Sequence, residues 1–119
     1  MVQSCYSSGV EVSFASTKFA RLCSSMDRMV RELGPEMARR LGTRLQELEA
    51  AESLADLRLL PQVRAHELGG DRDEQISLDL VHPRRLIIRA TNPPPRNPEG
   101  GLDWDAIKSV VVLEIADTH

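Results

Sequence analysis

The chain has 119 residues, of which 41% are hydrophobic and 3% aromatic, and its formal net charge is −3. This length fits a single domain with an aliphatic core, and the acidic balance argues against a protein whose whole surface binds nucleic acid, although a local basic groove is compatible with it. No apolar run approaches the roughly 18 residues that a membrane span needs, so no membrane contact is expected.

The first nine residues are polar, and we expect a disordered tail at 1–9 followed by one domain at 10–119. The start has neither a basic segment nor an apolar segment of the kind found in signal peptides. The two cysteines, Cys5 and Cys23, form neither a metal-binding spacing nor a disulfide framework, which favours a reducing cytoplasm.

The first half of the domain has the pattern of one strand and two helices. Residues 10–14 alternate between apolar and polar side chains, which predicts a short strand. Ser16 or Thr17 can cap a helix whose apolar stripe continues to Leu33, and Gly34-Pro35 ends that helix and begins another. We therefore predict an antiparallel two-helix hairpin. Three arginines of the second helix are expected on its solvent-exposed face: Arg39, Arg40 and Arg44.

The second half changes to the period of strands. A short helical turn is predicted at 53–60 and another at 103–108, with a proline-rich loop at 91–101. Four strands are predicted, at 63–68, 75–80, 84–90 and 109–116. The expected fold class is therefore α+β: an N-terminal strand, a two-helix hairpin and a four-stranded, mostly antiparallel sheet with the helices on one face.

One face of this sheet is predicted to be polar. Arg85 and Arg89 share a strand face, and on the preceding strand Ser77 and Asp79 lie opposite the apolar side chains. Guanidinium groups bind phosphate with two parallel hydrogen bonds, and histidines exchange protons near neutral pH. The simpler interpretation is a row of solvated charges. No metal-binding, nucleotide-binding or nucleophile-elbow motif is present, so we expect neither a metal nor a cofactor.

Several segments, in this order, resemble the RelE/ParE superfamily of bacterial toxins, and in particular its HigB or plasmid-maintenance killer branch. The resemblance covers about residues 10–119 and rests on EVSFAS (11–16), the helical hairpin, HELGGDR (66–72), DLVHPRRLII (79–88) and LEIADTH (113–119). It implies the RelE-like fold. It also suggests that translation begins at Val10, which a GTG start codon would turn into methionine.

The resemblance implies a toxin of a type II toxin–antitoxin system, a metal-independent endoribonuclease that cuts translated mRNA on the ribosome and so inhibits translation. The implied partners are the ribosome with its mRNA and a HigA-like helix-turn-helix antitoxin, with operator DNA bound only through that antitoxin. The catalytic residues that match the family are His66, Arg85, Asp117 and His119. Phosphate or RNA contacts are expected from Arg72, Arg84, Arg89 and His82.

Two positions depart from the family pattern. Thr118 stands where the family often has tyrosine, which removes a stacking surface, and Gly69 stands where some members have lysine, which removes a phosphate contact. Two alternatives therefore stay open: a ParE-like poison of DNA gyrase, which needs no C-terminal histidine, and a non-catalytic, degenerate toxin that only binds its antitoxin.

Overall fold

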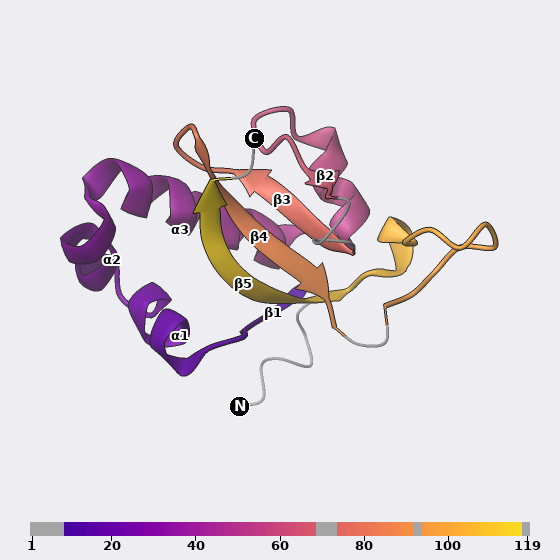
Figure 1. Cartoon of the computed structure of the whole chain (residues 1–119), viewed down its shortest axis with the longest axis horizontal. Helices are drawn as coiled ribbons and strands as arrows, with labels where there is room; N and C mark the ends of the chain where they lie inside the picture. Colours follow the sequence, from indigo (N-terminus) through magenta and orange to yellow (C-terminus); the bar gives the residue numbers. More distant parts are fainter. Residues whose placement is uncertain (1–8, 69–73, 92–93, 118–119) are drawn as a thin grey trace.

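The computed structural model describes residues 9–68, 74–91 and 94–117, with only the backbone of residue 117. The protein is α+β, with a mixed five-stranded sheet and helices packed on one face of it (Figure 1). Its elements are β1 (Glu11–Phe14), α1 (Thr17–Cys23), α2 (Met26–Leu33), α3 (Pro35–Ala50), the 3₁₀-helix η2 (Leu54–Leu59), β2 (His66–Glu67), β3 (Gln75–Asp79), β4 (Arg84–Ala90), the 3₁₀-helix η4 (Trp104–Ala106) and β5 (Ser109–Asp117).

The strand order is β1-β5-β4-β3-β2. The four strands of the second half pair as antiparallel neighbours, as predicted, but β1 joins the same sheet and runs parallel to β5. The helices between β1 and the rest of the sheet provide the long connection that a parallel pair requires. The sheet is consequently mixed and has five strands rather than four.

The prediction of a two-helix hairpin is wrong, because the first predicted helix is divided at Ser24 and Ser25. Ser24 donates from Oγ to the carbonyl of Arg21 at 2.7 Å, and the Ser25 side chain accepts from the backbone N–H of Arg28 at 3.4 Å. These serine hydroxyls compete with the helical hydrogen bonds and start a second helix. The break turns α2 relative to α1, and Met26 becomes about half exposed.

Helix α3 passes behind the sheet in Figure 1 and supplies most of the helical side of the core. Its Leu41 and Leu48, two turns apart, are fully buried. The strands contribute the side chains of alternate residues from the facing side, among them Ile76, Leu86 and Ile88. Burying each such side chain contributes about 1.5–3 kcal/mol, which fixes which face of the sheet points away from the helices.

Arg44 corrects a second expectation. Its side chain is only 2% exposed, whereas Arg39 and Arg40 are exposed as predicted. The guanidinium donates to the carbonyl of Asp79 at 2.7 Å, to the carbonyl of Gln62 at 2.8 Å and to the Glu47 carboxylate at 2.8 Å. Arg44 is buried because three acceptors from distant parts of the chain meet at this point.

In the described ranges no helix is both long enough and apolar enough to cross a membrane.

Candidate functional site

The polar face of the sheet begins with strand β2, which is much shorter than the predicted strand at 63–68. Arg64 has a φ of 49°, a left-handed conformation that an extended strand cannot contain, so pairing begins only at His66. Glu67 anchors the strand by accepting a hydrogen bond from Trp104 Nε1 at 2.7 Å. The Arg58 guanidinium lies 3.7 Å over the Trp104 ring and completes this anchor.

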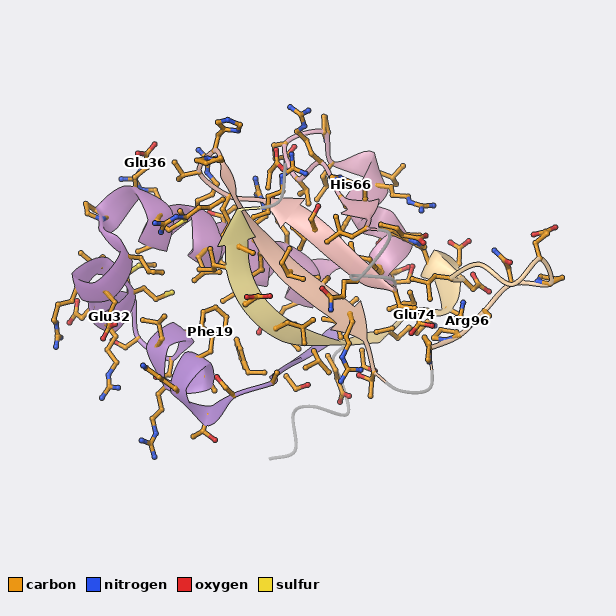
Figure 2. All side chains as sticks on the ribbon, in the orientation of Figure 1. Phe19, Glu32, Glu36, His66, Glu74 and Arg96 are labelled. Carbon is orange, nitrogen blue, oxygen red and sulfur yellow. The ribbon has the colours of Figure 1, made fainter. Side chains whose placement is uncertain are left out.

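The register of the strands brings His66 and Arg85 together. His66 pairs with Ser77 on β3, and two residues further along β3, Asp79 pairs with Arg85 on β4. Because side chains alternate along a strand, these four residues point to the same face. Figure 2 shows His66 on the side of the sheet where β2 lies beside β3.

His66 is exposed and has three polar neighbours. Its Nε2 lies 3.3 Å from Nη1 of Arg85 and 3.3 Å from Oγ of Ser77, and its Nδ1 lies 3.3 Å from the carbonyl oxygen of Arg64. A guanidinium can only donate, so a hydrogen bond from Arg85 requires the tautomer in which Nε2 accepts and Nδ1 carries the proton toward the carbonyl of Arg64. The imidazole therefore directs a basic nitrogen toward an arginine.

Arg85 also contacts an acid. Its Nε lies 3.4 Å from Oδ1 of Asp79, and its side chain is 19% exposed. Oδ1 is buried and has no hydrogen-bond partner among the described residues, so the contact is an ion pair without hydrogen-bond geometry. Arg64 approaches the other oxygen, with Nε 3.5 Å from Oδ2. One carboxylate thus lies between two guanidinium groups.

The remaining predicted residues lie elsewhere or outside the described residues. Arg89 shares the face of Arg85 but is four residues along β4, about 13 Å away, and its Nη1 lies 3.5 Å from the carbonyl of Ala90. Arg84, the neighbour of Arg85, lines a groove of about 880 Å³ between α1, α2 and β5. His82 is exposed in the turn between β3 and β4 and lines a smaller hollow at the α2–α3 junction.

Asp117 ends β5 with its backbone in register with Arg84, while Ala116 is the partner of Arg85. Arg72 and His119 lie outside the described residues, as do Gly69 and Thr118. The contact between His66 and Arg85 is therefore the part of the predicted site that the described residues contain.

Sequence reasoning missed Arg64 and gave no chemical role to Ser77 and Asp79. The period-two pattern placed Ser77 and Asp79 on the polar face, which was the available signal. Nothing in the sequence indicated that Arg64 would leave the extended conformation and turn its carbonyl toward His66.

A separate ion pair lies just before the start of β3. Figure 2 shows Glu74 and Arg96 close together and apart from His66, and the two side chains form an ion pair. This pair links the start of β3 to the segment that follows the proline-rich stretch, so both side chains are already engaged.

The chain matches no known protein family, no curated protein and no solved structure in the comparisons made with each.

Proposed function

We propose that the protein is the toxin of a type II toxin–antitoxin pair and that it cleaves translated mRNA without a metal. The observation that supports the proposal is the 3.3 Å contact between Nε2 of the exposed His66 and Nη1 of Arg85 on the polar face of the sheet. A basic nitrogen next to a phosphate-binding cation is the pairing that cleavage by a ribose hydroxyl requires.

In the proposed reaction the Nε2 of His66 removes the proton of a ribose 2′-hydroxyl. The 2′-oxygen then forms a bond to the adjacent phosphorus, and the bond from phosphorus to the 5′-oxygen of the next nucleotide breaks. The departing oxygen takes up a proton, and the products are a 2′,3′-cyclic phosphate and a 5′-hydroxyl end. Arg85 donates to the non-bridging oxygens, whose negative charge increases in the transition state.

Ser77 and Arg64 orient the base in this proposal. The carbonyl of Arg64 keeps the ring proton on Nδ1, and the buried hydroxyl of Ser77 lies against the ring. A base held in one tautomer and one orientation needs no rearrangement when the substrate arrives. His119 is proposed to donate the proton that the departing oxygen takes up. Asp117, whose backbone is in register with Arg84 rather than with Arg85, stays a predicted member of the catalytic set, and a helix-turn-helix antitoxin is the proposed partner.

The test is to express the chain from a tightly controlled promoter and to map RNA 5′ ends on translated and untranslated copies of one reporter. We expect new ends only in the translated copy, and their loss in His66→Ala and in a variant lacking His119. Lys108→Ala, at an exposed position outside the polar site, is the matched control and should cleave normally. Growth arrest without new ends would point to gyrase, and neither arrest nor new ends would point to a non-catalytic binding protein.

A further inference from the structure

Arg64 has a backbone conformation that calls for an explanation. Its φ of 49° lies in the left-handed region, which residues with a side chain rarely occupy. Such conformations persist where the surrounding contacts hold them, and they concentrate at functional sites. Here the conformation has two effects: the carbonyl of Arg64 lies 3.3 Å from His66 Nδ1, and its guanidinium lies beside Asp79.

Asp79 lies between two guanidinium groups but is too far from either to form a strong hydrogen bond. Its oxygens lie 3.4 Å from Nε of Arg85 and 3.5 Å from Nε of Arg64. Both distances exceed the roughly 2.7–2.9 Å of a strong charge-assisted hydrogen bond. Because each guanidinium approaches through Nε, terminal N–H groups are left over for another acceptor. One terminal nitrogen of Arg85 faces His66, while the ion pair of Arg64 with Asp79 uses its Nε and not its terminal nitrogens.

The charge of this cluster suits a phosphodiester. Two guanidinium groups against one carboxylate leave a single positive charge, and a phosphodiester carries a single negative one. The Arg64 side chain is 72% exposed, so a ligand can reach it, while Arg85 is 19% and Asp79 is 24% exposed. A phosphate placed beside His66 would therefore meet one largely buried arginine and one that is accessible.

We propose that Arg64 is a second phosphate-binding residue of the site and that Asp79 is the positioning residue that holds Arg64 and Arg85 for the same phosphate. The inference rests on the proposed function, because the phosphate would be that of the RNA. The competing explanation is an ordinary surface ion pair between Arg64 and Asp79, and such pairs contribute little.

Substitution of Asp79 separates the two explanations because they predict opposite signs. If the carboxylate only repels anions, Asp79→Asn tightens the binding of an anionic ligand. If it positions the two guanidinium groups, the same substitution weakens binding although it removes a negative charge. Asparagine has nearly the same shape, and the backbone carbonyl that accepts from Arg44 is unchanged.

The probe is a trinucleotide of 2′-O-methyl RNA, which has no free 2′-hydroxyl and cannot be cleaved. Its binding at low ionic strength is measured by NMR titration of the arginine Nε–Hε resonances. Arg64→Gln is expected to weaken binding about tenfold, the effect of losing a hydrogen bond between charged groups. Asp79→Asn alone is expected to weaken probe binding about fivefold. Added to Arg64→Gln, it is expected to weaken probe binding little further. Arg39→Gln, which removes an exposed charge on α3, should leave binding unchanged.

Wild-type affinity in Arg64→Gln, or tighter binding in Asp79→Asn, would overturn the inference, as would a wild-type protein that does not bind the probe. Thermal unfolding of each variant checks that the fold is intact, and the exposure of Arg64 makes its variant less disruptive to the fold than Asp79→Asn. Probe binding that depends on Arg64 without cleavage on the ribosome would refute the proposed function and leave the phosphate site standing.

Discussion

Arg44 of α3 donates from Nε to the backbone carbonyl of Asp79 at 2.7 Å, while the carboxylate of Asp79 pairs with Arg85 on the polar side of the sheet. The last residue of β3 is thus held from the helix layer by its backbone and contributes its side chain to the candidate site. A buried guanidinium in the core therefore fixes the position of a group on the opposite face.

Replacing Arg44 should destabilise the fold strongly. Arg44→Ala leaves the carbonyls of Gln62 and Asp79 without their donor and Glu47 without its cation, which we expect to lower the free energy of unfolding by about 3 kcal/mol. Urea unfolding followed by the fluorescence of Trp104, the single tryptophan of the sequence, measures the change. Arg39→Ala on the same helix should shift it by no more than about 0.5 kcal/mol. Equal changes in the free energy of unfolding would show that the buried hydrogen bonds of Arg44 do not stabilise the fold.

Ser77 should matter for the orientation of His66 more than for stability. Ser77→Ala removes the hydroxyl next to the imidazole, and we expect about a fivefold slower single-turnover cleavage of reporter RNA, the value of one hydrogen bond. Nitrogen-15 NMR of the imidazole should show a less uniform tautomer. Ser13→Ala is the control, because Ser13 is a strand serine on β1 whose hydroxyl donates to the carbonyl of Val110 at 3.3 Å and not to a histidine. A normal rate in Ser77→Ala would remove the orienting role.

Substitutions of Arg85 and Arg89 should have different effects on RNA cleavage, although the two residues lie on the same strand face. Arg85→Lys keeps the charge but loses the planar pair of donors, and cleavage is expected to fall about 100-fold. Arg89→Lys should reduce cleavage less than threefold, because Arg89 lies about 13 Å from Arg85 along β4. Single-turnover rates on a translated reporter measure both variants. Similar losses of cleavage rate in the two variants would mean that the RNA contacts arginines along the whole of β4.

Cys23 should be a poor nucleophile in the folded protein. Burial raises the pKa of its thiol from 9.0 to about 11, so at pH 8.5 it should hold about 100-fold less thiolate than an unshifted thiol. Since the unfolded thiol ionises first, its contribution to stability is complete below pH 9 and is lost as the pH rises toward 11.

Alkylation by iodoacetamide tests this in a Cys5→Ser variant, in which Cys23 is the single thiol. The rate should keep rising beyond pH 9 in the folded protein and level off earlier in urea. Identical pH profiles in the two conditions would show that the pKa is not raised.

The sequence alone was sufficient to predict which side chains of the central strands share a face of the sheet. Alternation along 75–80 and 84–90 placed Arg85 and Asp79 on one side, because a strand has a period of two whatever packs against it. The Gly34-Pro35 boundary was also readable, since Gly34 has a φ of 89°. The order of secondary-structure elements follows from such local signals.

Contacts between residues that are distant in the chain could not be predicted from the sequence. The burial of Arg44 depends on carbonyls 18 and 35 residues away in the chain, and the pairing of β1 with β5 depends on a partner at the other end of the domain. The contact between His66 and Arg85 needs the register of three strands. The break at Ser24-Ser25 was the exception, because two serines in an apolar helix were a usable local signal.

The parallel pairing of β1 with β5 has a kinetic consequence. Val12 pairs with Val110, 98 residues further along the chain, so closing this pair costs the conformational entropy of a very long loop. Contacts of such sequence separation slow folding, so we expect β1 to join the sheet after the local pairs of β3, β4 and β5 have formed. Until β1 joins, the edge of β5 that it covers is open and able to pair with a strand of another chain.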